Sequence, residues 1–205
     1  MKLVFLHGDP ATGKYTVGRE LAALTGYEFY HNHLVVDEVL TRHAFGTPGF
    51  VVERDRRWRD YFTRQIQERP RGVIFTFNPE NTVPQVFIDW LFATFRAARI
   101  DLLSVGLTAS ESAIESRLAS KQRQGFRKLT DIEHYRQLRA TGSFDTPIIP
   151  RTDLRIDTEA HPPAAAAQEI ARHFGLGSAQ PVGQAREEPS SLRHPPGMDP
   201  SFHTG

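Results

Sequence analysis

The ten residues HGDPATGKYT (7–16) decide how the rest of this sequence is interpreted. Four residues separate Gly8 from Gly13, and Lys14 follows directly, which is the spacing of a loop that wraps around the phosphates of a nucleotide. The next position in such a loop is usually a Ser or Thr that helps to hold Mg²⁺, but here it is Tyr15. The stretch therefore raises two questions: whether it is a nucleotide site, and of which kind.

The surroundings of the loop answer the first question. An apolar run over residues 2–6 predicts a strand before it, and apolar residues at helical spacing predict a helix from Lys14 to Thr25 after it, ended by Gly26. In this setting backbone N–H groups turn inward to bind anions, the helix N-terminus adds partial positive charge, and Lys14 reaches the β- and γ-phosphates. The predicted nucleotide-binding residues of the loop are Gly8, Asp9, Pro10, Ala11, Thr12, Gly13, Lys14, Tyr15 and Thr16.

The rest of the pattern alternates short apolar segments with amphipathic ones. Strands are predicted at 27–31, 72–77, 102–107 and 154–156, and helices at 34–40, 50–68, 83–98, 110–121, 131–139 and 164–174. This alternation predicts a three-layer α/β fold, with a parallel five-stranded sheet and helices on both of its faces. Residues 1–176 form one domain in this interpretation, and the Pro-, Gly- and Ser-rich stretch 177–205 forms a disordered tail.

Composition restricts the class of protein. The 205 residues carry a formal net charge of +1, which gives no indication of a nucleic-acid partner. There is no cysteine, which excludes disulfides and cysteine-based zinc sites. No stretch approaches the roughly 20 apolar residues that span a bilayer, and the apolar run at the start is too short for a signal peptide. We therefore expect a cytoplasmic protein without a membrane partner.

The order Gly-Lys-x-Thr at 13–16 resembles the loop of adenylate kinase and related nucleoside monophosphate kinases. The resemblance implies that Thr16 hydrogen-bonds the α-phosphate and that the nucleotide and water supply most ligands of Mg²⁺; whether Thr16 contacts the metal stays open. The predicted central strand ends in Thr-Phe-Asn at 76–78, without the acidic residue that motor ATPases and GTPase switches use for Mg²⁺. The loop thus favours a small kinase that uses ATP and Mg²⁺.

A second substrate is expected where the parallel strands end, beside the phosphate loop. Asp37 follows the second strand, in FYHNHLVVDEV, and a carboxylate there would orient or deprotonate an acceptor hydroxyl; the alternative is a solvated helix residue. Chloramphenicol phosphotransferase and shikimate kinase carry an Asp just after this strand, which is a similarity of position. The residues predicted to line the acceptor pocket are His31, Asn32, His33 and Asn78. The two histidines and His43 are a weaker candidate for a metal site, because no acidic partner has convincing spacing.

The basic stretch SRLASKQRQGFRKL follows the fourth predicted strand. The spacing of Arg117 and Lys121 resembles the Arg-x-x-x-Arg that opens the lid of adenylate, shikimate and gluconate kinases. The resemblance implies a lid over about 121–140, in which Arg117 stacks on the adenine while Lys121, Arg123 and Arg127 neutralise charge on the transferring phosphoryl group. For any one of these arginines, a solvated basic helix face is the alternative.

Two charged segments outside the lid are interpreted differently. Asp157 and Thr158 follow the last strand, where adenylate-kinase-like folds pass close to the adenine, and they complete the predicted nucleotide site. In the predicted helix 50–68, several arginines, Arg54 among them, alternate with acidic residues. This mixture predicts a solvated face.

Over about residues 1–175 the chain resembles a P-loop small-molecule kinase of the adenylate and shikimate kinase type. The implied reaction moves the γ-phosphoryl group of ATP to a hydroxyl of a metabolite or an antibiotic. The stretch FTFNPEN lacks both the glycine-rich acceptor loop of shikimate kinases and the Asp-Gly-Phe-Pro-Arg-like segment of nucleoside monophosphate kinases, so the acceptor is not specified. A nucleotide or nucleic-acid-end kinase and a regulatory nucleotide-binding protein without phosphotransfer are the alternatives; the sequence predicts no oligomeric state.

Overall fold

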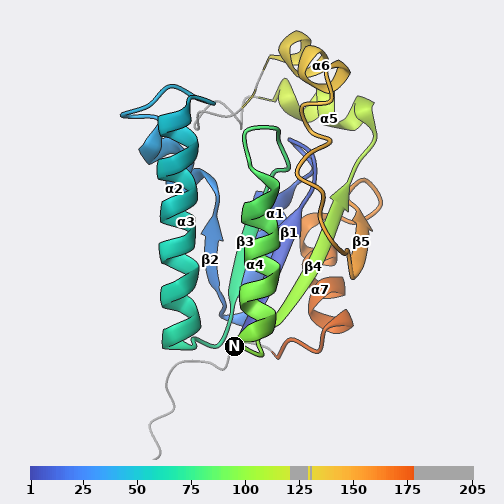
Figure 1. Cartoon of the computed structure of the whole chain (residues 1–205). Coiled ribbons are helices and arrows are strands. Elements are labelled where there is room, and N and C mark those ends of the chain that lie inside the picture. Colours follow the sequence, from blue (N-terminus) through green and yellow to red (C-terminus); the bar gives the residue numbers. More distant parts are fainter. Residues whose placement is uncertain (121–128, 130, 178–205) are drawn as a thin grey trace, which may run out of the picture.

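A computed structural model describes residues 1–120, 129 and 131–177 of the chain. Its centre is a five-stranded parallel sheet with the strand order β2-β3-β1-β4-β5 (Figure 1). The strands are β1 (Lys2–His7), β2 (Glu28–His31), β3 (Val73–Phe77), β4 (Asp101–Thr108) and β5 (Leu154–Asp157). The predicted α/β fold is confirmed, and the phosphate-loop strand β1 lies in the middle of the sheet.

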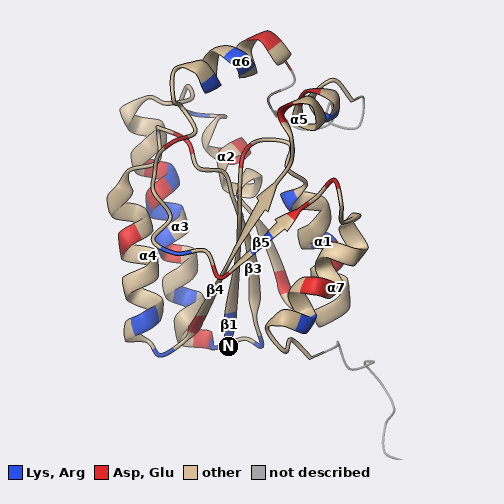
Figure 2. Cartoon of the chain, turned by 90° about the vertical axis from the view of Figure 1, so that its right-hand side faces the viewer, with Lys and Arg blue, Asp and Glu red and all other residues tan. Residues whose placement is uncertain are grey.

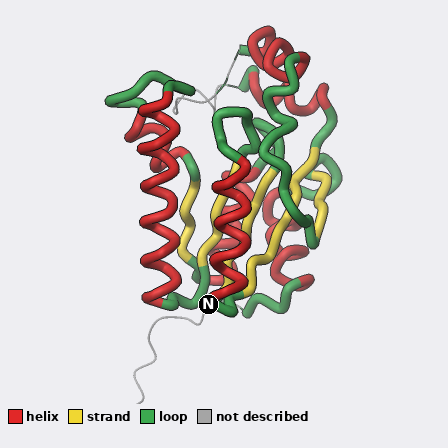
Figure 3. The backbone as a smooth tube through the Cα atoms, viewed as in Figure 1, coloured by secondary structure: helices red, strands yellow, loops and turns green. Residues whose placement is uncertain are grey.

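The helices cover both faces of the sheet and the edge where its strands end (Figures 1 and 3). They are α1 (Lys14–Thr25), α2 (His33–Val39), α3 (Pro48–Glu68), α4 (Gln85–Ala97), α5 (Glu111–Leu118), α6 (Ile132–Ala140) and α7 (Pro163–His173). Figure 2 shows α3 and α4 on one side of the sheet and α1 and α7 on the other. Helices α5 and α6 lie above the carboxyl ends of the strands, where a ligand of an open α/β sheet binds.

Side chains of β1 alternate between two apolar cores. Leu3 and Phe5 pack with α3 and α4, whereas Val4 and Leu6 pack with α1 and α7, and all four are fully buried. Because a central parallel strand is covered on both faces, it appears in the sequence as a continuous apolar run rather than as an alternating pattern. The first core is strongly aromatic and centres on Phe75 of β3, which contacts the rings of five neighbours: Phe5, Tyr30, Trp58, Phe62 and Phe77.

Local chemistry moves several helix ends away from their predicted positions. Helix α3 begins at Pro48 rather than at 50, because the Thr47 side chain accepts a hydrogen bond from the backbone N–H of Phe50 and caps the helix. Helix α4 begins only at Gln85, since Pro84 has an extended backbone. Helix α5 ends at Leu118 rather than at 121.

Parts of the sequence interpretation lie outside the described residues. The predicted lid residues Lys121, Arg123 and Arg127 belong to the undescribed stretch 121–128, and all but the first residue of the predicted tail belongs to 178–205. Within the described parts of the chain, no helix combines the length and the apolar character needed to cross a membrane.

We predict that Phe75→Ala lowers the free energy of unfolding by about 3–5 kcal/mol, because it opens a cavity among rings that are packed on every side. Urea unfolding followed by circular dichroism measures the change. Val52→Ala on α3 is the control, because the Val52 side chain is exposed and its truncation leaves no cavity. Equal losses in the two variants would contradict this description of the core.

Candidate active site

The phosphate loop, residues 8–13, joins β1 to α1 and lies against β4. Gly8 has φ 149°, and a Cβ atom at this position would lie 2.3 Å from the backbone oxygen of Leu107 in β4. Gly13, which precedes α1, has φ 90° and is therefore also in the region that favours glycine. Both glycines of the sequence pattern are thus required by backbone geometry, and no side chain fits at Gly8.

Lys14 closes the loop from its helical end. Its Nζ donates hydrogen bonds to the backbone oxygens of Gly8 at 2.7 Å and Asp9 at 2.6 Å, so the ammonium lies over the loop. The Thr12 hydroxyl donates to the same Asp9 oxygen at 2.9 Å, and the Thr16 hydroxyl donates to the Gly13 oxygen at 2.9 Å. A positive charge, two hydroxyls and a helix N-terminus at one point suit the oxygens of a polyphosphate.

The same donor set bears on the predicted metal. Thr16 places one hydroxyl at the start of α1, which suits a single ligand of Mg²⁺. Within the described residues, no three histidine or acidic side chains gather in a way that could hold a metal ion, and the suggested cluster of His31, His33 and His43 is therefore not formed. The residues fit Mg²⁺ that arrives with a nucleotide better than Mg²⁺ held in a protein cage.

Tyr15 takes the place of the usual metal-binding hydroxyl and packs sideways against β2. Its ring lies edge-on to Phe29, with 5.5 Å between ring centroids, and edge-on to His31, with 5.2 Å. The Arg19 guanidinium lies 5.9 Å from the Tyr15 ring centroid, one turn further along α1. Tyr15 therefore joins the phosphate loop to the end of β2, where the acceptor is predicted to bind.

Arg117 connects three segments around the loop. Its guanidinium donates to the Thr158 hydroxyl at 2.8 Å, to the Thr158 backbone oxygen at 3.0 Å and to the Ala11 oxygen at 3.3 Å. The structure thus brings Arg117 and Thr158 to the phosphate loop, as the nucleotide-site prediction requires, and adenine stacking on Arg117 stays a prediction. Asp157 caps the turn beyond β5, where its carboxylate accepts from the Glu159 N–H at 2.9 Å.

The sequence interpretation missed one contact of the loop with α6. The Arg139 guanidinium donates to the Asp9 carboxylate at 2.9 Å across 130 residues of sequence. The Asp9 carboxylate is therefore bound to α6, above the sheet, instead of facing a nucleotide alone. Nothing in the sequence pattern around Asp9 signals this partner.

A cavity of about 890 Å³ opens beside the phosphate loop. Lys14 and Thr16 line one wall, Asn32 and His33 line a second, and Asn78 lies on a third, after β3. Two of the predicted residues lie elsewhere. His31 packs against Phe29 and Tyr15, and Asp37 lies one helical turn beyond His33 in α2; neither is among the residues that line the cavity.

Helix α3 contributes a buried arginine to the cavity wall, which corrects the prediction of a solvated face. Arg54 is only 1% exposed and lines the cavity together with Trp58 and Glu80. Its five N–H donors all have partners at 2.8–3.1 Å, namely the Asp55 and Glu80 carboxylates and the hydroxyl and backbone oxygen of Thr82. The guanidinium also lies 4.9 Å from the Trp58 ring centroid. Arg54 therefore builds the wall and has no donor left for a ligand.

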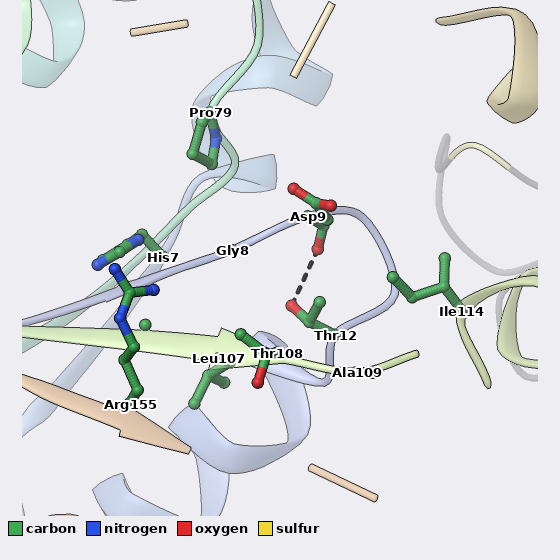
Figure 4. Close-up of a pocket in the computed structure, with 11 residues that line it drawn as sticks. His7, Gly8, Asp9, Thr12, Pro79, Leu107, Thr108, Ala109, Ile114 and Arg155 are labelled. Atoms are coloured by element: carbon green, nitrogen blue, oxygen red, sulfur yellow. Dashed lines mark hydrogen bonds between the residues drawn. The ribbon is translucent and has the colours of Figure 1, made fainter. Parts of the chain in front are cut away.

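A smaller hollow of about 220 Å³ lies on the β4 side of the phosphate loop (Figure 4). His7, the last residue of β1, is 7% exposed there, and its Nε2 lies 3.2 Å from the Thr152 hydroxyl. Burial lowers the pKa of His7 to about 4, and the positive charges of Lys14 and Arg155 act in the same direction. His7 is therefore neutral at pH 7, beside a loop that already carries an ammonium group.

The comparisons with known proteins concern the fold. No family model matches the chain, and no curated protein matches it. Among solved structures, a sugar kinase from a Janibacter species is 14% identical, with a TM-score of 0.58 over 86% of this chain and 95% of the other. A shikimate kinase from Acinetobacter baumannii, in complex with shikimate, is 18% identical, with a TM-score of 0.57 over 85% and 93%.

A third solved structure extends the likeness to a resistance protein. The tunicamycin resistance protein of Deinococcus radiodurans is 15% identical, with a TM-score of 0.50 over 88% of this chain and all of the other. The chain is similar to these proteins along nearly their whole length. The chain therefore shares the fold of these three proteins, and the predicted α/β fold is confirmed.

The state of His7 predicts how stability depends on pH. Its pKa is about 4 in the folded chain and about 6.5 in an unfolded one, so between these values the unfolded state binds more protons. Stability must then fall as pH falls through this window, by about 2 kcal/mol between pH 7 and pH 5 from His7 alone. Urea unfolding at both pH values measures this loss, and His7→Gln should remove most of it. An unchanged pH dependence in His7→Gln would contradict a buried neutral histidine.

The Arg54 network predicts a second effect on stability. Arg54→Ala leaves the Asp55 and Glu80 carboxylates without their positively charged partner at the cavity wall. The substitution should therefore lower the free energy of unfolding by about 3–5 kcal/mol. Arg54→Lys should not restore it, because an ammonium cannot replace five planar donors. Arg56→Ala on the exposed side of the same helix is the matched control and should cost far less. Thermal unfolding of the three variants decides between a buried clamp and an ordinary surface charge.

Proposed function

We propose that this protein transfers the γ-phosphoryl group of ATP, bound as its Mg²⁺ complex, to a hydroxyl group of a small molecule. One observation carries the proposal: the ammonium of Lys14 and the phosphate loop open directly onto an 890 Å³ cavity whose other walls carry amide and imidazole side chains. A cavity of this size suits one small acceptor beside the terminal phosphate. The kinase fold of the chain supports this arrangement of nucleotide and acceptor.

The nucleotide half of the site is formed by the chain's own donors. The loop amides and Lys14 bind the phosphates, and the Thr16 hydroxyl binds either a phosphate oxygen or Mg²⁺. Arg117 and Thr158 form the side on which the base lies. When Mg²⁺ is bound, it neutralises part of the charge on the β- and γ-phosphate oxygens. Lys14 adds positive charge where negative charge accumulates as the phosphoryl group moves.

The acceptor half lies at the carboxyl ends of β2 and β3. Asn32, His33 and Asn78 offer hydrogen-bond donors and acceptors toward the cavity, which suits a molecule with hydroxyl groups. Orientation or deprotonation of the reacting hydroxyl is a role for α2, which begins at His33 and carries Asp37 one helical turn later. Metabolites and antibiotics are both candidates, since a sugar kinase, a shikimate kinase and a tunicamycin resistance protein are among the similar structures.

We predict that Lys14→Ala reduces phosphoryl transfer at least about 100-fold, because it removes the ammonium that donates to the Gly8 and Asp9 oxygens of the loop. The full chain is incubated with γ-labelled ATP, Mg²⁺, and either a cell metabolite extract or an antibiotic panel. Mass spectrometry then identifies newly phosphorylated molecules. Lys2→Ala is the matched control, since Lys2 lies at the opposite end of β1 and donates to the Phe174 oxygen.

The outcomes separate the proposed function from its alternatives. A labelled small molecule that the Lys14 variant no longer forms supports the kinase, and its identity names the acceptor. A labelled nucleotide or oligonucleotide end would instead indicate a nucleotide or nucleic-acid-end kinase. If the wild type binds ATP but forms no product in any arm, the regulatory nucleotide-binding protein replaces the enzyme.

A further inference from the structure

The first residue of α2 and the carboxylate one turn later form a pair at the wall of the cavity. His33 Nδ1 lies 3.8 Å from Asp37 Oδ1, an i,i+4 contact on one face of the helix. The side chains are 25% and 36% exposed, so neither is fully solvated. A histidine next to a carboxylate is the arrangement in which the carboxylate orients the ring and stabilises its protonated form.

The two members of this pair do not lie equally close to the acceptor. His33 lines the cavity, together with Lys14 and Asn78, whereas Asp37 is not among its lining residues. His33 Nδ1 is buried next to Asp37, while the side chain as a whole is 25% exposed and lines the cavity. The group placed to take a proton from an acceptor hydroxyl is therefore the imidazole, and the carboxylate lies behind it.

Contacts from two neighbouring elements fix the place of this pair. The backbone N–H of Asn32, directly before α2, donates to the hydroxyl of Thr76 at the end of β3, at 3.4 Å. On the far side, Arg57 of α3 holds Glu38 at 2.6 Å, which anchors the residue next to Asp37. The position of His33 is thus set by β3 on one side and by α3 on the other.

We propose, on the basis of the proposed kinase function, that His33 is the proton acceptor of the reaction and that Asp37 is its positioning residue. As the acceptor oxygen forms its bond to the γ-phosphorus, the bond from that phosphorus to the β–γ bridging oxygen breaks, and ADP leaves. The hydroxyl proton moves to Nε2 of His33, whose positive charge the Asp37 carboxylate balances. After product release the proton passes to water, and the imidazole is neutral again.

The test uses the full chain with Mg²⁺-ATP and the metabolite extract or antibiotic that yields product with the wild type. His33→Gln should lower the turnover at least about 100-fold while ATP affinity stays within about twofold. Asp37→Asn should lower it at least about tenfold, with the acceptor KM little changed. Asp60→Asn, an exposed carboxylate on α3, and His173→Gln, an exposed ring on α7, are the matched controls and should retain wild-type turnover.

Two readouts report the proton-accepting role itself. Free imidazole should restore transfer in His33→Ala and should not do so in Asp37→Asn, because only the first variant lacks the ring. In histidine ring NMR of the full chain, Asp37→Asn should lower the pKa of His33, since it removes the carboxylate that favours the imidazolium. Among the described residues, His31 lies next to this ring, and the Glu38–Arg57 pair holds the same helix. The other titratable or charged groups that line the cavity include Lys14, Arg19, Glu80, Arg117 and His134, and the variant leaves all of them in place.

Each failure has a different signature. If His33→Gln keeps turnover within about threefold of the wild type while Asp37→Asn loses it, the carboxylate acts directly and the inference is wrong, although the kinase stands. A second failure would be that imidazole does not restore transfer in His33→Ala and that Asp37→Asn leaves the pKa of His33 unchanged. The pair would then be structural, and the inference would also be wrong. If the wild type itself forms no product, the proposed function is wrong, and the inference, which rests on it, is wrong as well.

Discussion

The site depends on how closely the phosphate loop lies against β4. At Gly8 the backbone is so near the Leu107 oxygen that a single added carbon would collide with it at 2.3 Å. This contact is possible because β1 pairs with both β3 and β4, so the end of β1 lies next to the end of β4. From there the chain turns directly into α1, and Lys14 is delivered over the loop by helix geometry. The acceptor wall can then be formed by β2 and β3, on the opposite side from β4.

Charge is distributed unequally around the cavity. On the α3 side, Arg54 is enclosed by two carboxylates and a threonine, so it serves as a rigid and electrically compensated part of the wall. On the loop side, the Lys14 ammonium donates to the backbone oxygens of Gly8 and Asp9 and to the Thr12 hydroxyl. Phosphate oxygens can outcompete these neutral acceptors, because hydrogen bonds between two charged groups are stronger. His7 adds no positive charge at neutral pH, because it is buried. Among these groups, the Lys14 ammonium at the loop is the positive charge that an anion can reach.

The sequence predicts the structure correctly where the structure depends on the spacing of neighbouring residues. The glycines and the lysine of the phosphate loop, and the apolar runs of the buried strands, follow directly from backbone geometry and burial, and their predictions are confirmed at the level of the fold. Contacts between distant residues were missed. Arg54 looks like a surface charge because acidic neighbours surround it in sequence, whereas its burial depends on Glu80 and Thr82, 26 and 28 residues away. The Arg139–Asp9 contact joins residues 130 positions apart, so no periodic pattern in the sequence indicates it.

The position of α2 shows why roles are harder to predict from sequence than the place of a segment. Alternation along an extended strand places His31 and His33 on one face, but the strand ends at His31 and the helix begins at His33. This change of period from two to 3.6 gives the two neighbouring rings different surroundings: His31 stays with β2 and packs against Tyr15, whereas His33 lines the cavity. It also places Asp37 one helical turn after His33, outside the residues that line the cavity. The bulky Tyr15, where a small hydroxyl is usual, thus occupies the space beside His31 and connects the nucleotide half of the site to the acceptor half.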